Sequence, residues 1–114
     1  MDFKITCVKI YVTVPVGYTE KIREAMCNAG AGIIGDNYSD CSNVIKCIGT
    51  FKPINNANPF IGKKDKLEIV EEEKLEIICK KDKVKEVIKV LRETHPYEEP
   101  AIDIIPLLDE DNFK

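Results

Sequence analysis

The residues best suited to chemistry lie close together in the segment from His95 to Pro100, whose sequence is HPYEEP. This segment holds the only histidine of the chain and two adjacent glutamates. Imidazole and carboxylate groups are common ligands of divalent ions such as Zn²⁺ and Cu²⁺, so His95 with Glu98 or Glu99 predicts a metal site. Adjacent residues of an extended chain point in opposite directions, and at most one of the two glutamates therefore faces such a site.

The same segment also has a structural interpretation. His95 would lie at the C-terminus of a helix, where a protonated imidazole interacts favourably with the helix dipole. The proline after it would end the helix, and Tyr97 would pack against a neighbouring element. The sequence leaves both interpretations open.

A second group of possible ligands lies in the glycine-containing stretch from Gly35 to Ser42. Asp40 and Cys41 supply oxygen and sulfur there, and this pair together with His95 is a possible soft-metal site. His95, Glu98 and Cys41 are the metal-ligand candidates that we select. The alternative, which we favour, is a turn that connects a helix to a strand. The glycines follow the expected helix and precede the strand, which is the wrong order for a dinucleotide-binding motif.

Composition and charge limit the classes of function. The 114 residues suffice for a single domain (1–114), and 44% hydrophobic and 32% charged residues are ordinary values for a soluble protein. The net charge is −3, and the 17 Lys and Arg residues are interleaved with acids, which argues against a nucleic-acid partner. The sequence shows neither a signal-peptide pattern nor an apolar run near the ~20 residues that span a bilayer. No membrane partner and a cytoplasmic location are therefore expected.

The five cysteines also argue against a secreted or zinc-ribbon protein. Their number is odd and they form no Cys-x-x-Cys pair, which is typical of neither a disulfide framework nor a structural zinc site. Apart from Cys41, they fall in apolar segments, where cysteine behaves as a small hydrophobic residue.

Hydrophobic periodicity predicts four strands and two helices in the order β-α-β-β-α-β. The expected strands cover about residues 4–14, 41–51, 67–79 and 101–107. Thr19 and Asp82 are the expected N-caps of the two helices, and the first should end at Gly30 or Gly32. This order is that of a ferredoxin-like α+β sandwich, a four-stranded antiparallel sheet with two helices on one face.

The side chains of the sheet indicate a second buried face. In the first strand, Val8, Ile10, Val12 and Val14 would lie under the helices. The opposite set is also largely apolar, and it comprises Phe3, Ile5, Cys7, Lys9, Tyr11 and Thr13. We therefore expect self-association through this face, unless the loop of residues 52–66 folds over it. The acidic run Glu71–Glu73 is expected to be a solvated bend of the third strand, with Glu72 or Glu76 as a minor ligand candidate.

Several motifs occur in an order that resembles one known family. They are Gly30–Gly35 (GAGIIG), Asn37-Tyr38, Cys41-Ser42, Gly49–Pro53 (GTFKP), Asn58–Gly62 (NPFIG), Glu72 with Leu75-Glu76, and His95–Ala101 (HPYEEPA). They resemble the YqfO-type domain, which occurs inserted in Nif-three-like proteins and also stands alone. The resemblance extends from about Tyr11 to Leu107.

This resemblance implies a fold like that of the CutA and PII proteins, whose ferredoxin-like chains form trimers around their sheets. A homotrimer is therefore expected, although the apolar sheet by itself is equally compatible with a dimer. In PII-like proteins the long loop between the second and third strands contacts ligands, which points to Asn58 and Phe60, with Tyr97, as ligand-binding residues. Alternatively, this loop packs on itself and Phe60 locks a neighbouring subunit.

The resemblance also limits the expected chemistry. Full-length Nif-three-like proteins carry a dinuclear metal centre, but its ligands lie in flanking domains outside these 114 residues. The label of GTP cyclohydrolase given to some of the larger proteins therefore does not transfer. The family commonly has a histidine where this chain has Asp40, and this difference weakens a soft-metal site that includes Cys41.

Two classes of function remain, with a third beside them. The first is a non-enzymatic CutA/PII-like module that binds a metal ion or small ligand at subunit clefts, with a regulatory or metal-homeostasis role. The second is an enzyme such as a metal-assisted hydrolase, for which no paired nucleophile and base are visible. The third is a protein–protein interaction domain. We favour the binding module.

Overall fold

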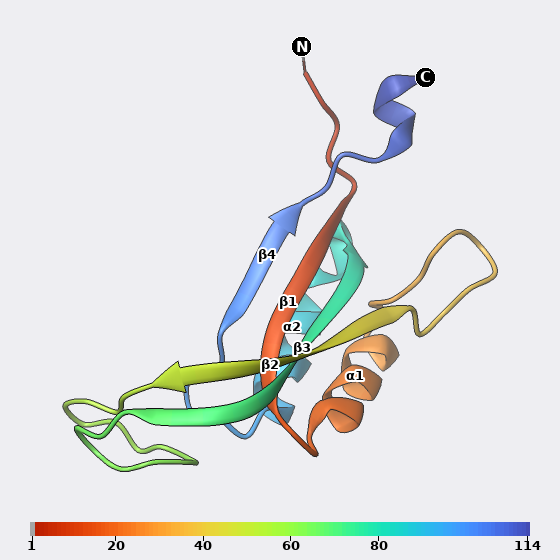
Figure 1. Cartoon of the computed structure of the whole chain (residues 1–114). Coiled ribbons are helices and arrows are strands. Elements are labelled where there is room, and N and C mark those ends of the chain that lie inside the picture. The colour runs from red at the N-terminus through yellow and green to blue at the C-terminus, as the bar shows by residue number, and fades with distance from the viewer. Residues whose placement is uncertain (1) are drawn as a thin grey trace.

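Four strands and two α-helices follow one another in the expected order (Figure 1). The computed structural model describes residues 2–114. The strands are β1 (Cys7–Pro15), β2 (Ser42–Phe51), β3 (Glu68–Lys80) and β4 (Ile102–Pro106), and the helices are α1 (Thr19–Asn28) and α2 (Val84–Thr94). Short 3₁₀ helices at Lys81–Lys83 and Glu110–Phe113 precede α2 and follow β4.

The strands form an antiparallel sheet in the order β2-β3-β1-β4, and both helices cover one of its faces. Every second residue of β1, from Val8 to Val14, is buried on that face. The same core contains Ile22 and Met26 of α1 and Val87 and Leu91 of α2. The predicted ferredoxin-like fold and its helix-covered face are therefore confirmed. Neither α-helix in residues 2–114 is long and apolar enough to cross a membrane.

The helix N-termini differ from the prediction. Tyr18, not Thr19, precedes α1, and the Thr19 hydroxyl donates a hydrogen bond of 2.6 Å to Glu73 Oε1 of β3. Lys83, not Asp82, precedes α2, because residues 81–83 form a 3₁₀ turn in which Asp82 makes no capping hydrogen bond. Tertiary contacts and the extra turn thus replace the local caps that the sequence suggested.

The segment before β1 pairs with the end of the chain and does not extend the strand. β1 begins at Cys7, three residues later than expected. The rings of Phe3 and Phe113 lie 5.7 Å apart, and Lys4 exchanges hydrogen bonds of 2.9 and 3.1 Å with the Asn112 side chain. Both ends of the described chain consequently lie together, at the end of β1 opposite α1 (Figure 1).

The second face of the sheet is covered at one end only. The loop between β2 and β3 folds against the end that carries Thr13, Phe51 and Glu72. The sequence left open that the loop of residues 52–66 folds over this face, and the loop does so for part of it. Elsewhere on the same face Ile45 and Ile105 remain 48% and 39% exposed.

Candidate ligand-binding cavity

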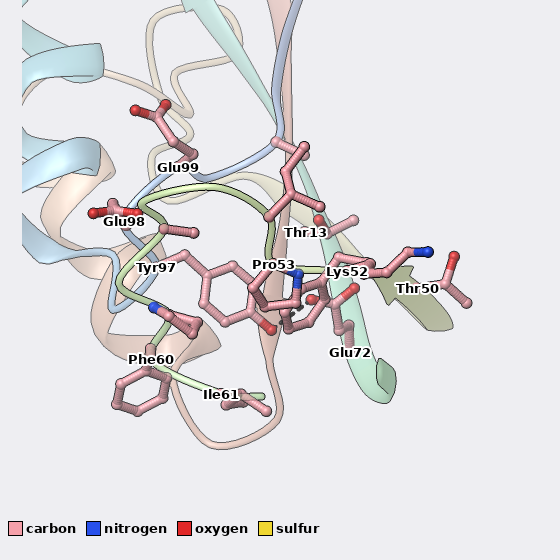
Figure 2. Close-up of a pocket in the computed structure, with 15 residues that line it drawn as sticks. Thr13, Thr50, Lys52, Pro53, Phe60, Ile61, Glu72, Tyr97, Glu98 and Glu99 are labelled. Carbon is pink, nitrogen blue, oxygen red and sulfur yellow. Dashed lines mark hydrogen bonds between the residues drawn. The ribbon is translucent and has the colours of Figure 1, made fainter. Parts of the chain in front are cut away.

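A cavity of about 340 Å³ lies between the β2–β3 loop and the segment that connects α2 to β4. Its volume lies at the lower end of the roughly 300–1,000 Å³ range of small-molecule sites. Phe51 and Pro53 line it from the end of β2, Phe60 from the loop, and Tyr97 and Glu98 from the α2–β4 segment (Figure 2). Residues distant in sequence therefore meet at one end of the sheet.

Aromatic rings form one wall of this cavity. The ring centroid of Phe60 lies 6.4 Å from that of Tyr97 and 5.6 Å from that of Tyr18, the latter in an edge-to-face arrangement. The Phe51 ring lies 6.1 Å from Tyr97. Such pairs stabilise the packing of a loop beyond the area that they bury, so Phe60 and Tyr97 attach the loop to the rest of the molecule.

A main-chain contact closes the loop over the α2–β4 segment. The backbone amide of Asn58 donates a hydrogen bond of 3.1 Å to Glu98 Oε1. The structure thereby brings together the sequence-predicted residues Asn58, Phe60, Tyr97 and Glu98. Asn58 contributes through its main chain in this contact, whereas Phe60 and Tyr97 contribute their rings.

A buried carboxylate and a phenol meet at the base of the cavity. Glu72 is only 6% exposed, and its Oε2 accepts a hydrogen bond of 2.7 Å from the Tyr97 hydroxyl (Figure 2). Burial and the bond to Glu72 raise the pKa of Tyr97 above its usual value, so the phenol remains a protonated donor at neutral pH. The expectation that Glu71–Glu73 is a solvated run is therefore wrong for Glu72.

Gly49 of β2 makes the position of Glu72 possible. A methyl group built at Gly49 would overlap Glu72 Oε1. Glu72 pairs with Cys47 in the β2–β3 register, so its side chain leans diagonally across β2 over the glycine two residues away. Glycine inside a strand often marks such a close approach. Sequence reasoning missed this pair, although a glycine in a strand opposite an acidic run was a signal that could have found it.

His95 is buried where α2 ends and is held by two main-chain groups. Its Nε2 lies 2.8 Å from the Thr13 carbonyl oxygen, and its Nδ1 accepts a hydrogen bond of 3.1 Å from the Tyr97 amide. The Nε2–H tautomer satisfies both contacts. The predicted helix end at His95 is confirmed, but burial lowers the pKa of the imidazole, so a protonated ring facing the helix dipole is not what the structure favours.

Cys41 lies away from His95, at the start of another strand. It immediately precedes β2, the edge strand, and its amide donates a 2.9 Å hydrogen bond to the Gly32 carbonyl. Strand β3 lies between β2 and β1, the strand whose Thr13 carbonyl His95 contacts. Its neighbour Asp40 accepts a 3.2 Å hydrogen bond from Arg23, as expected for a turn held to α1.

The metal-binding residues considered from sequence are therefore not gathered in one place. Within residues 2–114, no group of three or more His, Cys, Asp or Glu side chains is arranged to hold a metal ion. A metal at His95 would also have to displace the hydrogen bond at one of its two ring nitrogens. Binding of Zn²⁺ or Cu²⁺ by His95, Glu98 or Cys41 stays a prediction.

Comparisons with solved structures identify the class of fold. No family model matches the chain. The periplasmic divalent cation tolerance protein CutA from Archaeoglobus fulgidus superposes with a TM-score of 0.66 at 22% identity, over 93% of this chain and 91% of that one. CutA from Synechococcus elongatus PCC7942 gives a TM-score of 0.69 at 11% identity, over 94% and 81% of the two chains. At these identities the likeness shows the fold alone, and that fold is CutA-like.

Proteins of similar sequence show which family with this fold the chain resembles. The GTP cyclohydrolase 1 type 2 homolog from Halalkalibacterium halodurans is 49% identical over 102 residues, which are 90% of this chain and 27% of that protein. Its Bacillus subtilis counterpart is 48% identical over 87% of this chain and 26% of its own length. A Bacillus cereus protein related to NIF3 superposes with a TM-score of 0.76 at 39% identity, over 93% of this chain and 27% of that one.

The chain thus spans about a quarter of the length of the curated relatives that it matches. It corresponds in sequence and in structure to one part of these larger proteins. The expected resemblance to the YqfO-type domain of Nif-three-like proteins is confirmed.

Proposed function

We propose that this chain is a non-enzymatic, self-associating module that binds a small ligand in the cavity beside Tyr97. The observation that carries this proposal is a preformed cavity whose wall is aromatic and whose base holds one buried polar pair, Glu72 and Tyr97. A largely apolar lining with few well-placed polar groups is typical of small-molecule sites. The CutA-like fold and the Nif-three-like relatives support a regulatory or homeostatic role for such binding.

The arrangement of His95 supports binding over catalysis. A general base needs a free nitrogen within reach of a substrate proton. Both ring nitrogens of His95, the only histidine, contact main-chain groups in this structure. The name of the larger relatives suggests a GTP cyclohydrolase activity, but the chain matches about a quarter of their length, and we do not assign that activity to it.

Exposed apolar residues support self-association, with a homotrimer proposed. The hairpin of β2 and β3 extends beyond the helices (Figure 1), and on its helix side Ile48 and Ile69 are 72% and 69% exposed. The two residues are diagonal neighbours on adjacent strands, and contiguous exposed apolar surface is typical of interaction sites. As part of the same proposal the module acts in the cytoplasm, where the five cysteines, all free in this structure, would stay reduced.

Native mass spectrometry tests the assembly and metal parts of the proposal together. We expect a mass of three chains and a shift toward the monomer in Ile48→Ser. Leu108→Ser, which changes another exposed apolar residue, is the control. Spectra recorded with added Zn²⁺ or Cu²⁺ would show whether each chain also takes a metal ion, and His95→Ala would show whether His95 holds it. A monomer at micromolar concentration would contradict self-association.

Ligand-observed NMR with a library of small fragments tests the cavity. We expect fragments that bind the wild type to lose binding in Phe60→Ala, because Phe60 forms part of the wall. Phe113→Ala, which alters the terminal pair far from the cavity, should retain them. A library without any Phe60-dependent binder would contradict the proposed binding function.

A further inference from the structure

The carboxylate of Glu72 is buried without a lysine or arginine beside it, and both ring nitrogens of the nearby His95 contact main-chain groups. This leads to a specific class of ligand. We propose that the cavity binds an organic ammonium ion, whose charged nitrogen lies against Glu72 and whose carbon skeleton packs on the aromatic wall. The inference rests on the proposed binding function and deepens it, because it names the chemistry of the ligand.

The burial of Glu72 is the first step. Its side chain is 6% exposed, and the Tyr97 hydroxyl is its hydrogen-bond donor. Among residues 2–114, the Lys and Arg side chains that form ion pairs do so with other acids, and none pairs with Glu72. Buried carboxylates are almost always paired, since an unpaired buried charge is costly. The missing cation is therefore supplied from outside this chain.

The second step is access to the carboxylate. Tyr97 binds Oε2, and no side chain in the described residues donates to Oε1. Every fully buried side-chain nitrogen or oxygen of residues 2–114 has a hydrogen-bond partner, so Oε1, which has none, is not fully buried. The absent side chain of Gly49 leaves the room that Oε1 occupies. The site thus offers one free acceptor oxygen, which is what an N–H⁺ group needs.

The third step is the surroundings of that oxygen. The rings of Phe51, Phe60 and Tyr97 form one wall of the cavity, and aromatic faces attract organic cations through their quadrupoles. Glu98 and Glu99 also line the cavity, but Glu99 pairs with Arg92, and both carboxylates point away from the Glu72–Tyr97 pair (Figure 2). Glu72 is therefore the negative charge that a bound cation would meet. Lys52 also borders the cavity, but its amino end points away from the Glu72–Tyr97 pair (Figure 2). Charge, shape and apolar surface agree on an ammonium ligand.

Three probes of similar size and different charge test the inference. They are phenethylammonium, neutral 2-phenylethanol and anionic 3-phenylpropionate, titrated by ligand-observed NMR at neutral pH. We expect phenethylammonium to bind about tenfold or more tightly than the alcohol, because hydrogen bonds to charged groups are stronger than neutral ones. The anionic probe should bind weakest.

Isosteric variants assign the preference to Glu72. In Glu72→Gln the ammonium probe should lose its advantage over the alcohol, whereas Glu71→Gln, the exposed neighbour on the other face of β3, should keep it. Gly49→Ala is a second route to the same result, because its methyl group would displace the carboxylate without removing it. It also serves if Glu72→Gln fails to fold, as judged by circular dichroism.

The outcomes separate this inference from the broader proposal. If the neutral or anionic probe binds as tightly as the ammonium, or the preference survives in both variants, the ligand class is wrong while the cavity remains a binding site. If no probe binds and Glu72→Gln instead changes the subunit count in native mass spectrometry, a basic residue of a second copy supplies the cation, and the inference is overturned. Fragment binding that depends on Phe60 then decides the proposed function separately.

Discussion

The two faces of the sheet differ in the side chains that they bury. The helix-covered face is a continuous apolar core in which Ile10, Leu75 and Ile77 are almost fully buried. The opposite face mixes apolar and polar side chains, and it contains Glu72, a buried carboxylate. The first face has the composition that stabilises a fold, whereas the second carries groups whose burial costs free energy unless they are paired.

The buried polar residues are moreover confined to one end of the molecule. Thr19, Glu72 and His95 are the buried polar or charged residues of the described chain, and each is tied to a particular partner there. All three lie near the C-terminal end of β1 and the beginning of β3. The comparison teaches that apolar burial is spread over the helix-covered face, while the buried polar contacts are concentrated at one end of the sheet, where Glu72 lines the cavity.

The largest expected effect lies in the helix-covered face. Leu75→Ala should lower the free energy of unfolding by about 2–5 kcal/mol, because it leaves a cavity in a fully buried site. Denaturation in urea measures this loss. Ile45→Ala, on the same hairpin but facing the other side, should cost clearly less in the monomeric chain. An equal loss at Ile45 would show that the second face is covered as completely as the first.

The next effect concerns the hydrogen bond at the cavity. Tyr97→Phe removes the donor to Glu72 and keeps the ring, so the carboxylate loses its partner. We expect a loss of about 1–3 kcal/mol in the free energy of unfolding. Tyr38→Phe, which changes a tyrosine that is 72% exposed, should stay within about 0.5 kcal/mol. An equal loss of stability in Tyr97→Phe and Tyr38→Phe would mean that the burial of Glu72 does not depend on the Tyr97 hydroxyl.

A double-mutant cycle between Gly49 and Glu72 sharpens the comparison further. Gly49→Ala alone should destabilise by about 1 kcal/mol, because the added methyl group overlaps Glu72 Oε1. In a Glu72→Ala background the same change should be neutral or stabilising, since alanine is the better strand residue of the two. Additive effects in urea denaturation would show that the two residues do not compete for space.

The smallest expected effect is a pH dependence from His95. Burial holds the folded-state pKa of this imidazole below its unfolded value of about 6.5, so the unfolded chain binds the proton first as the pH falls. The contribution of neutral His95 to the free energy of unfolding is fully present above pH ~6.5. It is lost as the pH drops through the lowered folded-state pKa.

Urea denaturation at pH 7.5 and pH 5.5 measures this dependence. Because His95 is the only histidine, the difference between wild type and His95→Gln isolates it from the carboxylates. The wild type should lose more stability on acidification than the variant. The same loss in both proteins would contradict a buried, neutral His95.

The fold was largely predictable from sequence because periodicity reports burial directly. The alternation of Val8 to Val14 and the helical spacing of Val87 and Leu91 indicated the core that the structure contains. The caps at Thr19 and Asp82 were not predictable, because local hydrogen bonding gave way to a contact with β3 and to a 3₁₀ turn. The predicted start of β1 was wrong for a related reason, since the residues before Cys7 pair with the C-terminal segment.

The cavity was only partly predictable. Phe60 and Tyr97 stood out by residue type, and the structure brings their rings to 6.4 Å from each other. Glu72 was hidden in a run of three glutamates, two of which are not buried. Its burial depends on Gly49, which lies diagonally across from it, and on the strand register that brings the two together. The glycine was visible in the sequence, but the register cannot be read from the local sequence. Cys41 stood out by chemistry alone, and the fold places it elsewhere.

The joined ends of the chain have a consequence for how this unit combines with other polypeptides. Phe3 packs on Phe113, and Lys4 binds Asn112, so the chain enters and leaves at the same end of the sheet. The β2–β3 loop, which lines the cavity, lies at the other end of the molecule (Figure 1). A unit with adjacent ends can be spliced into a surface loop of a host protein without stretching either partner. Inserted in this way, it would project outward with its Tyr97 end facing solvent, and a host domain or an affinity tag would leave that end free.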